Sequence, residues 1–458
     1  MTTFPESLLV ANRGEIARRV IRTANKLGVR TIAVYHKVDA DLPYVSEAGQ
    51  AVQLDGDPPV NAYLDGEQIV RIAKEVGATA VHPGYGFLAE NAEFARAVTQ
   101  AGLTWVGPAA EVIDVMGDKV ESRRVVAAAG VPISGDVGAA LATGEEAIQE
   151  SRRLGYPVMM KASAGGGGIG MAVAHDDESL RKAFEKTRSM ALRSFGSDRV
   201  FVERYVSSAR HVEVQILGLD DGTIVTLGER DCSTQRRHQK LIEESPAPHL
   251  DPKLRQRLHD SAVAAAQAVG YRNAGTVEFL LDTATGDFVF LEMNTRIQVE
   301  HPITELTHDV DLVEQQLSIA ESGRTTHDLT PESRGHAIEL RICAEDPVRF
   351  FPRPGQITEW QEPTGDGIRV DSGYAVGGEV TPHFDSLVAK VCAHGATREE
   401  ARTRALAACQ DFVIGGLVTN REFLIEVLES DDFISGNYDT GVVGRIQQRR
   451  KSTARRSA

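Results

Sequence analysis

Four consecutive glycines, at positions 165–168, most constrain how this chain can fold, and they lie within "YPVMMKASAGGGGIGMAVAHD". A glycine run loses backbone entropy on folding and contributes no packing, so it indicates a place where another group approaches the backbone closely. The apolar segments on either side predict a strand, a glycine loop and a second strand. No Gly-Lys-Ser/Thr follows the run, so it is not a Walker A loop.

Phosphate oxygens are the leading candidate for the approaching group, because successive N–H groups without Cβ obstruction form a concave anion site. Lys161, just before the loop, and Lys119 in "MGDK" can each offer a positive charge to a phosphate. A mobile hairpin without a ligand is the alternative, since glycine runs are often only loops. We therefore predict a mobile glycine-rich lid over a phosphate group.

The stretch "GTVEFLLDTATGDFVFLEMN" predicts a β-hairpin with "TATG" as its turn. Alternating apolar residues assign one face of it to the core: Val277, Phe279, Leu281, Val289, Leu291 and Met293. The other face then carries Glu278, Glu292 and Asn294, with Glu278 opposite Glu292 or one diagonal step away. Like charges opposite each other destabilise a sheet, so these carboxylates need a proton or a cation between them.

Two glutamates and an asparagine form an all-oxygen ligand set that suits Mg²⁺ or Mn²⁺, and such ions usually also hold substrate phosphates. An ion bound there would link the hairpin to the glycine loop. The alternative is a pair of solvated glutamates. The pattern therefore predicts a metal site at Glu278, Glu292 and Asn294.

The hairpin runs on into "LEMNTRIQVEHP", where polar residues take every second position from Glu292 to Glu300. In an extended chain these side chains share one face, as they also would on a solvent-facing edge strand, which is the alternative. Arg296 matches a small oxyanion with two hydrogen bonds, Gln298 adds a neutral one, and Glu300 can remove a proton. Together they predict a pocket for a small planar acid beside the γ-phosphate.

Strand, helix and strand alternate from "SLLVA" through "TIAVY" to "ATAVH" and "LTWVG", which predicts a parallel α/β domain without a GxGxxG dinucleotide motif. At 458 residues the chain is too long for one core. We predict an α/β protein with an N-terminal parallel α/β domain (1–105), a helical connector (106–132), a lid subdomain (133–206), a metal-binding core (207–335), a C-terminal mixed α+β domain (336–445) and a disordered basic tail (446–458).

The composition excludes several classes of protein. A formal net charge of −15 opposes nucleic-acid binding, and the basic tail "RIQQRRKSTARRSA" is expected to be a solvated terminus. No run resembles a membrane span, and "MTTFPESLLV" lacks the features of a secretory leader, so we expect a cytoplasmic protein with no membrane partner. Four cysteines without CxxC spacing are expected to be reduced thiols and not zinc ligands.

Together these residues resemble biotin carboxylase, a member of the ATP-grasp family, from position 11 to about 440. The resemblance is carried by "ANRGEIARR" (11–19), "HPGYGFLAEN" (82–91), "MGDK" (116–119), "KASAGGGGIGM" (161–171), "RHVEVQ" (210–215), "ERDCSTQRRHQK" (229–240), "EMNTRIQVEHP" (292–302) and "RICAEDP" (341–347). Each motif alone is weak, whereas their order and spacing are specific. The resemblance implies that the lid and the core form an ATP-grasp fold.

Carried over residue by residue, the resemblance implies a site for ATP, Mg²⁺ or Mn²⁺, and bicarbonate. The positions expected to contact ATP are Lys119, Lys161, Gly167, Gly168, Glu203, Arg204, Tyr205, Val206, His211 and His238. The positions expected to hold the metal are again Glu278, Glu292 and Asn294. The bicarbonate pocket is expected to contain Lys240, Arg296, Gln298 and the backbone of Val299.

The implied reaction is the ATP-dependent carboxylation of biotin by bicarbonate, with biotin carried on a separate protein. Glu300 would deprotonate bicarbonate, whose attack on the γ-phosphate gives carboxyphosphate. This intermediate breaks down to carbon dioxide and phosphate, and the phosphate takes a proton from the ureido nitrogen of biotin. Arg341 would stabilise the biotin enolate, because its positive charge lies where negative charge develops.

No lysine flanked by methionines, the pattern that accepts biotin, occurs in the chain. The resemblance therefore implies a free-standing, homodimeric subunit of an acyl-CoA carboxylase, such as the acetyl-CoA carboxylase of fatty acid biosynthesis or a propionyl-CoA carboxylase. Its partners would be a biotin carboxyl carrier protein and carboxyltransferase subunits. The alternatives are another ATP-grasp ligase, which joins a carboxylate to an amine, and a non-catalytic nucleotide-binding module.

Two positions of the glycine loop depart from the family. Ala164 and Ile169 stand where glycine and arginine are expected, which costs the lid some freedom and one positive charge. Cys232 lies inside a family motif, but no base is evident beside it, so we expect it to pack and not to react.

Overall fold

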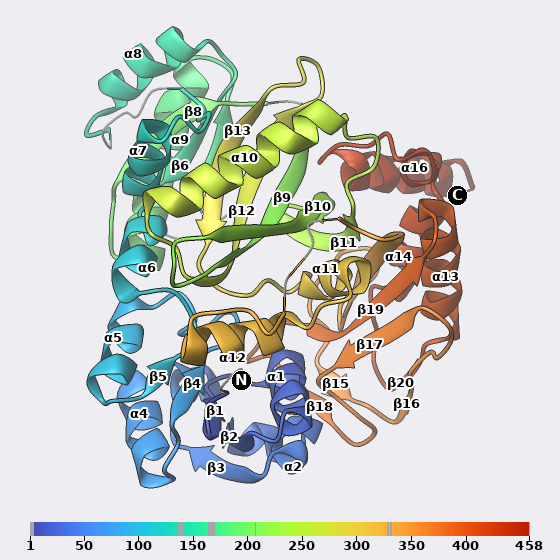
Figure 1. Ribbon diagram of the computed structural model, residues 1–458. Coiled ribbons are helices and arrows are strands. Elements are labelled where there is room, and N and C mark those ends of the chain that lie inside the picture. The colour runs from blue at the N-terminus through green and yellow to red at the C-terminus, as the bar shows by residue number, and fades with distance from the viewer. Residues whose placement is uncertain are drawn as a thin grey trace.

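The computed structural model describes residues 4–135, 141–163, 170–206, 208–327, 329 and 332–457. The N-terminal part is a parallel sheet in the order β3-β2-β1-β4-β5 (Figure 1). Its strands are β1 (Ser7–Val10), β2 (Arg30–His36), β3 (Gln50–Leu54), β4 (Ala80–His82) and β5 (Thr104–Trp105). Its helices are α1 (Gly14–Lys26), α2 (Pro43–Glu47), α3 (Pro59–Leu64), α4 (Gly66–Glu75) and α5 (Ala92–Gln100), and a short 3₁₀ turn covers Lys37–Asp39.

Both faces of this sheet are covered, because successive residues of its strands enter different cores. Leu8 and Val10 pack with Val20 of α1, whereas Leu9 packs with Ile69 of α4 on the opposite face. A parallel sheet buried on both sides is typical of strand and helix alternation along the chain. The prediction of an N-terminal parallel α/β domain is therefore confirmed.

The connector and the lid subdomain follow. They contain α6 (Ala110–Gly117), α7 (Lys119–Ala128), α8 (Gly144–Leu154), β6 (Val158–Ala162), β7 (Met171–Ala174), α9 (Asp177–Phe195) and β8 (Val200–Arg204). β6 pairs with β7 and with β8, both antiparallel, so the strands predicted on either side of the glycine loop are present. The loop itself, with Ala164, Gly167, Gly168 and Ile169, lies outside the described residues.

An eight-stranded sheet in the order β13-β12-β9-β10-β11-β14-β19-β17 forms the centre of the molecule (Figure 1). Its strands are β9 (Ala209–Gly218), β10 (Ile224–Arg236), β11 (Gln239–Ser245), β12 (Asn273–Asp282), β13 (Phe288–Asn294), β14 (His336–Cys343), β17 (Ile368–Ser372) and β19 (Leu387–Gly395). Because β14 pairs with β11, the sheet continues across residue 335, where the sequence predicted a domain boundary.

The two faces of β9 have different roles. Val212 and Val214 point to the core, where they pack with Leu258 and Ala262 of α10 (Pro252–Ala268). The residues that alternate with these valines along β9 therefore point to the opposite face, which carries polar side chains. In Figure 1, α10 crosses the face of β9 and β12, so the other face is left to other groups.

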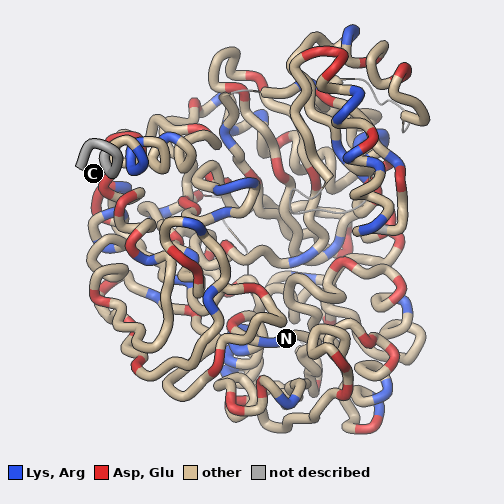
Figure 2. The backbone as a smooth tube through the Cα atoms, turned by 180° about the vertical axis from the view of Figure 1, so that it is seen from behind, with Lys and Arg blue, Asp and Glu red and all other residues tan. Residues whose placement is uncertain are grey.

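The remaining elements are helices and two small sheets that lie outside the large sheet. The helices are α11 (His301–His308), α12 (Leu312–Ser322), α13 (Arg398–Asp411), α14 (Arg421–Glu429), α15 (Asp431–Ser435) and α16 (Val442–Ser457). Two small sheets pair β15 (Gly355–Gln356) with β18 (Glu379–Val380), and β16 (Glu359–Gln361) with β20 (Val413–Gly415). No described helix has the length and apolar character needed to cross a bilayer. Figure 2 shows acidic and basic residues interspersed along the chain.

The predicted disorder of the tail from residue 446 is wrong, because these residues continue α16. Ile446 is buried in the core, and Arg450 pairs with Glu426 at 2.6 Å and lies over the ring of Phe423. The exposed Arg449 and Lys451 therefore lie on the outer face of a docked helix, a common arrangement for basic residues that flank a few apolar ones.

The predicted core face of the hairpin is confirmed for Met293 but wrong for Val289 and Leu291 in the first part of β13. The register shifts between Glu278 and Phe279, which inserts a β-bulge in β13. Beyond the bulge the parity is reversed, so Phe288 and Phe290 are buried in the core instead of Val289 and Leu291. On the other side of the bulge, toward the end of β13, Glu278 lies directly opposite Glu292. This is the first of the two predicted registers.

The close packing of β12 generates a prediction. A Cβ atom added to Gly275 would lie 2.5 Å from Cζ of the buried Tyr271 ring. We expect Gly275→Ala to lower the free energy of unfolding by about 1–3 kcal/mol, since the ring must move. Gly444→Ala is the control, because no described atom outside its chain neighbours and the backbone of α16 lies within 4 Å of its Cβ position. That variant should be neutral or more stable by about 0.5–1 kcal/mol. Equal urea midpoints for both variants would contradict the packing.

Candidate active site

A row of charged residues crosses four neighbouring strands on the polar face of the large sheet. Arg230 on β10 pairs with Glu213 on β9, Glu213 with Glu278 on β12, and Glu278 with Glu292 on β13. Residues paired directly across antiparallel strands point to the same face. Three carboxylates therefore stand side by side, and this arrangement is unfavourable unless cations are placed among them.

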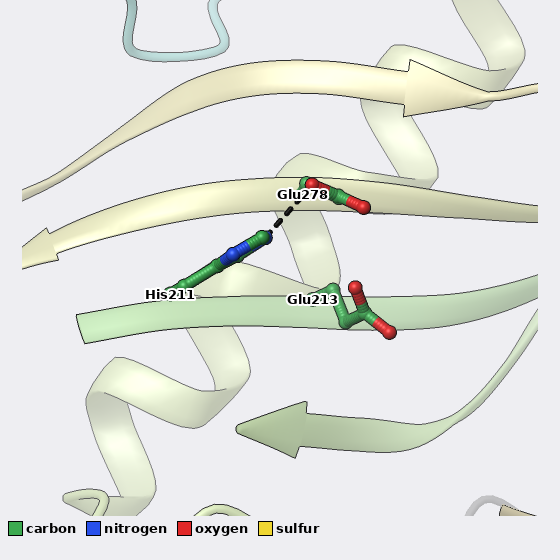
Figure 3. Close-up of side chains that lie close together, drawn as sticks. All are labelled: His211, Glu213 and Glu278. Atoms are coloured by element: carbon green, nitrogen blue, oxygen red, sulfur yellow. Dashed lines mark hydrogen bonds and ion pairs between the residues drawn. The ribbon is translucent and has the colours of Figure 1, made fainter. Parts of the chain in front are cut away.

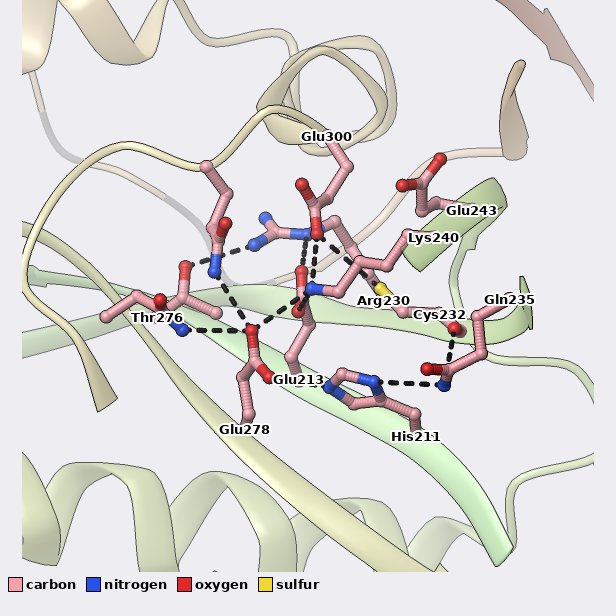
Figure 4. Close-up of polar contacts among 12 residues, drawn as sticks. His211, Glu213, Arg230, Cys232, Gln235, Lys240, Glu243, Thr276, Glu278 and Glu300 are labelled. Carbon is pink, nitrogen blue, oxygen red and sulfur yellow. Dashed lines mark hydrogen bonds and ion pairs between the residues drawn. The ribbon is translucent and has the colours of Figure 1, made fainter. Parts of the chain in front are cut away.

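Lys240 is the cation that several of these carboxylates share (Figure 4). Its Nζ donates to Glu213 Oε2 at 2.6 Å, Glu278 Oε1 at 3.1 Å and Glu300 Oε1 at 2.6 Å. At the other side of Glu213, Arg230 Nε donates to Oε1 at 2.6 Å. Both Glu213 and Glu300 are 0% exposed, so these cations replace the water that the charges have lost.

Glu300 is also held by Arg341, which comes from β14. Arg341 Nη2 lies 2.9 Å from Glu300 Oε2, and its Nε donates to Glu243 Oε1 at 2.6 Å. Burial raises the pKa of Glu300, but Lys240 and Arg341 outweigh burial and hold that pKa well below its usual range. Burial dominates for Glu243 and raises its pKa to about 7. Glu300 is thus a carboxylate gripped by two cations.

Arg296 and Gln298 lie beside these groups, although the chain there is not a strand. β13 ends at Asn294, and residues 295–300 form turns and bends before α11 begins at His301, so the predicted extended face beyond Asn294 is wrong. Side-chain hydrogen bonds place the groups instead. Arg296 donates to Gln298 Oε1 and Asn294 Oδ1, both at 3.0 Å, and Gln298 Nε2 donates to Glu278 Oε1 at 3.0 Å.

The N-terminal domain contributes to the placement of this turn. Glu90 Oε2 accepts from Arg296 Nε at 2.9 Å, and Glu90 Oε1 accepts from the backbone N–H of Thr295 at 3.3 Å. The pKa of Arg296 is raised, because these acidic neighbours outweigh the effect of burial. The guanidinium therefore stays charged beside the row of glutamates.

Histidine and lysine side chains also lie near the carboxylates of this row. His211 Nε2 lies 2.7 Å from Glu278 Oε2. Figure 3 shows this contact. Burial lowers the pKa of His211, but Glu278 outweighs burial and raises that pKa. Lys119, the first residue of α7, lies 3.1 Å from Glu292 Oε2. The exposed His238 occupies the turn between β10 and β11 with φ +69.

Lys161 and Glu203 form a second ion pair, between β6 and β8 of the lid subdomain. Glu203 also accepts from Arg123 Nη1 at 2.8 Å. Burial raises the pKa of Glu203, but the two cations outweigh it and lower that pKa. Arg204 is exposed, and Tyr205 and Val206 are partly buried at the end of β8.

The predicted metal ligands share one face and supply hard oxygen donors. Glu278 and Glu292 are opposite each other, and Asn294 Nδ2 donates to Glu278 Oε1 at 2.9 Å. Glu292 pairs with Lys119 and is 29% exposed in its side chain, so an ion could reach it. This set fits Mg²⁺ or Mn²⁺. The alternative group of His211, Glu213 and Glu278 fits less well, because Lys240 already binds both of its carboxylates.

Most of the predicted site residues meet at this one place. Those that hydrogen bonds or ion pairs join into one network are His211, Lys240, Glu278, Asn294, Arg296, Gln298, Glu300 and Arg341. Glu292 is linked to Lys119, and Lys161 to Glu203. Cys232 is buried, 3.7 Å from Glu300, and burial raises its thiol pKa, which suits the predicted packing role.

Sequence reasoning missed Glu90, Glu213, Arg230 and Glu243. A signal existed for Glu213, since His211, Glu213 and Gln215 alternate in "RHVEVQ" and therefore share the polar face. The positions of Glu90 and Glu243 depend on contacts between distant segments, for which the sequence offers no local pattern.

The shared role of Lys240 generates a prediction. We expect Lys240→Met to leave buried carboxylates without their cation, which should lower the free energy of unfolding by about 3–5 kcal/mol at pH 8. Without the cation, burial raises the pKa of these carboxylates, so the folded variant binds protons that the unfolded chain does not. Its stability should therefore recover as the pH falls from 8 to 6. Urea unfolding at both pH values measures this.

Lys182→Met is the control, because Lys182 forms an exposed pair with Glu178 on α9. Its loss should change the free energy of unfolding by less than about 1 kcal/mol at either pH. A Lys240→Met protein with the stability of this control, or one that weakens as the pH falls, would show that Lys240 does not neutralise the row.

Comparison with known proteins matches nearly the whole chain. Residues 5–113 match the family described as "Biotin carboxylase, N-terminal domain". Residues 118–327 match the family "Carbamoyl-phosphate synthase L chain, ATP binding domain", and residues 339–445 match "Biotin carboxylase C-terminal domain". Among curated relatives, a biotin carboxylase of Halalkalibacterium halodurans is 46% identical over 441 residues, which are 96% of this chain and 97% of that protein. A pyruvate carboxylase subunit of Methanothermobacter thermautotrophicus is 43% identical, over 96% of this chain and 90% of the relative.

Solved structures agree with this match. The biotin carboxylase domain dimer of Hydrogenobacter thermophilus 2-oxoglutarate carboxylase, in complex with MgADP, ADP and bicarbonate, superposes with a TM-score of 0.94 at 42% identity and covers 97% of this chain and 98% of that chain. A Campylobacter jejuni biotin carboxylase–βγ-ATP complex also reaches 0.94, at 41% identity, over 96% of this chain and 99% of that one. The chain therefore belongs to the biotin carboxylase family of ATP-dependent ligases.

Proposed function

We propose that this chain carboxylates biotin carried on a separate protein, with bicarbonate as the carbon source and ATP as the driving nucleotide. The observation that carries the proposal is the grip of Lys240 and Arg341 on the carboxylate of Glu300, with Arg296 and Gln298 alongside. Such a cluster offers cations for a small acid and a base to deprotonate it. The relatives crystallised with MgADP and bicarbonate, or with a nucleotide, support the same assignment.

The position of Glu300 explains how a carboxylate of low pKa can act as a base. In the structure, Lys240 and Arg341 both pair with Glu300. Bicarbonate bound between Arg296 and these cations would compete for their positive charge. The pKa of Glu300 then rises, because its favourable partners are shared with another anion. The base is thus strengthened only when its substrate is present.

The proposed reaction has three steps: phosphoryl transfer to bicarbonate, breakdown of carboxyphosphate, and carboxylation of biotin. Glu300 takes the proton of bicarbonate, one bicarbonate oxygen bonds to the γ-phosphorus of ATP, and the bond from that phosphorus to the bridging oxygen of ADP breaks. Carboxyphosphate then splits into carbon dioxide and phosphate. The phosphate removes the ureido N–H proton of biotin, and the nitrogen attacks carbon dioxide. Arg341 stabilises the enolate that forms, since its guanidinium is fixed by Glu243.

ATP is proposed to lie between the row of glutamates and the lid. Lys119, Lys161, His211 and His238 would face its phosphates, with residues 203–206 beside the adenine and Gly167 and Gly168 over the phosphates. Mg²⁺ bound at Glu278, Glu292 and Asn294 would neutralise phosphate charge during transfer. Lys119 and Lys161 are now paired with Glu292 and Glu203, so phosphates would take over cations that these carboxylates hold.

The partners of the reaction belong to the same proposal. Biotin would arrive on a biotin carboxyl carrier protein in the cytoplasm, and a carboxyltransferase would pass the carboxyl group to an acyl-CoA such as acetyl-CoA or propionyl-CoA. A homodimer is proposed, as in the dimeric relative. Relatives at similar identity belong to carboxylases that are named for pyruvate and 2-oxoglutarate. Supplying each acceptor to the complex reconstituted with its carrier and transferase distinguishes them.

The direct test of function is ATP hydrolysis with bicarbonate, with and without free biotin. We expect hydrolysis to require bicarbonate and to rise when biotin is added. Glu300→Gln should lower the bicarbonate-dependent rate about 100-fold or more, because the base is lost, and leave the ATP dissociation constant within about twofold. Hydrolysis that is indifferent to bicarbonate and to biotin would favour another ATP-grasp ligase.

Glu229→Gln is the matched control for that variant. Glu229 is also buried and held by a cation, because Arg255 Nε donates to its Oε1 at 2.9 Å, but its described partners include none of the proposed site residues. A glutamine there also removes the charge of a buried carboxylate, and the rate should stay within about threefold of wild type. Equal losses in both variants would mean that a general disturbance of the core, and not the base, explains the loss.

A further inference from the structure

Lys390 on β19 is a buried cation that none of the proposed steps uses. It reaches the turn that joins β13 to α11, residues 295–300, which we call the active-site turn. The carbonyl of Gln298 in this turn accepts a local bond from the His301 ring at 2.8 Å. The carbonyl of Val299 instead accepts from Lys390 Nζ at 2.8 Å, across 91 residues of chain. Val299 stands between two site residues, Gln298 and Glu300.

The environment of Lys390 keeps its amine charged. Burial lowers the pKa of Lys390, but Glu15 and Glu339 outweigh it and raise that pKa. Glu15 Oε2, from α1 of the N-terminal domain, lies 3.1 Å from Nζ, and Asp371 on β17 lies 3.9 Å away. The side chain is 0% exposed, so no water competes for its donors. One ammonium group therefore joins the N-terminal domain, the C-terminal region and the active-site turn.

Stability alone is a poor reason for a lysine at this place. Burying an ion pair costs desolvation free energy, and apolar side chains of similar volume are often as stable or more so. The bond to the Val299 carbonyl is different, because hydrogen bonds from charged donors are short and directional. The active-site turn has no strand or helix ladder to orient its peptide groups, so this donor fixes the peptide that precedes Glu300.

We propose that Lys390 is a positioning residue for the bicarbonate pocket. By holding the carbonyl of Val299, it sets the direction from which Gln298 and Glu300 enter the site, and Glu15 holds the lysine in turn. This role rests on the proposed function, since it concerns the same pocket. It predicts an effect on bicarbonate that is separate from any effect on ATP, because the described partners of Lys390 include none of the residues proposed to hold the nucleotide.

Lys390→Met removes the ammonium group and keeps most of the side-chain volume. We expect the KM for bicarbonate to rise at least tenfold and kcat to fall several-fold, with the KM for ATP within twofold of wild type. The control is Arg398→Met. Arg398 also joins a buried carboxylate, Glu244 at 2.7 Å, to a backbone carbonyl, that of Phe433 at 2.7 Å, but away from the turn.

The Arg398→Met protein should have a lower melting temperature and an unchanged KM for bicarbonate. A Lys390→Met protein with wild-type values, or one whose KM rises equally for ATP and bicarbonate, would overturn the positioning role. So would an Arg398→Met protein with the same selective defect. If wild type shows no bicarbonate-dependent hydrolysis, the proposed function itself fails, and this is distinguishable from an active wild type with a normal Lys390→Met variant.

A second variant decides the question if Lys390→Met does not fold. Glu15→Gln keeps the lysine and its bond to Val299 but removes its nearest counter-charge. We expect a threefold to tenfold rise in the KM for bicarbonate, with the KM for ATP unchanged. Wild-type kinetics for Glu15→Gln in a folded protein would overturn the proposal.

Discussion

The structure depends on the repulsion among carboxylates that the sheet places in register. Glu213, Glu278 and Glu292 stand on neighbouring strands, and cations beside the buried Glu213 and Glu278 offset the repulsion within this row. Lys240 and Arg230 provide that charge without substrates. In the proposed function, the metal would bind Glu278 and Glu292, phosphates would bind Lys119, and bicarbonate would bind Lys240 and Arg341. Binding would then exchange partners among charges that are already fixed in place.

The residues of this site come from three distant parts of the chain. Glu90 and Glu15 come from the N-terminal domain, Lys240 and Glu278 from the central strands, and Arg341 and Lys390 from the strands beyond residue 335. Because one eight-stranded sheet carries the last two groups, their spacing is set by the β ladder. The active-site turn has no ladder of its own, so its geometry is held by side chains from each of these parts.

Much of this could be predicted from local patterns in the sequence. Period-two alternation placed Glu278 and Glu292 on one face, and the α/β alternation predicted the parallel N-terminal sheet. The errors have physical causes. A bulge in β13 reversed the parity that alternation assumes, so Phe288 and Phe290 took the core positions given to Val289 and Leu291. Arg296 to Glu300 do converge, but through hydrogen bonds to Asn294, Glu278 and Lys240, not through an extended strand. Glu90 and Lys390 act across long separations that no local pattern records.

In the proposed mechanism, the cation-held base Glu300 directs bicarbonate, and not water, at the γ-phosphate of ATP. The fate of oxygen from ¹⁸O-labelled bicarbonate during turnover with biotin tests this step. The attack described above leaves one bicarbonate oxygen on phosphorus when carboxyphosphate breaks down, so the released phosphate should carry one ¹⁸O atom for each turnover. Phosphate that carries no ¹⁸O would contradict this mechanism, because its fourth oxygen would then come from water and the acid pocket would not take part in phosphoryl transfer.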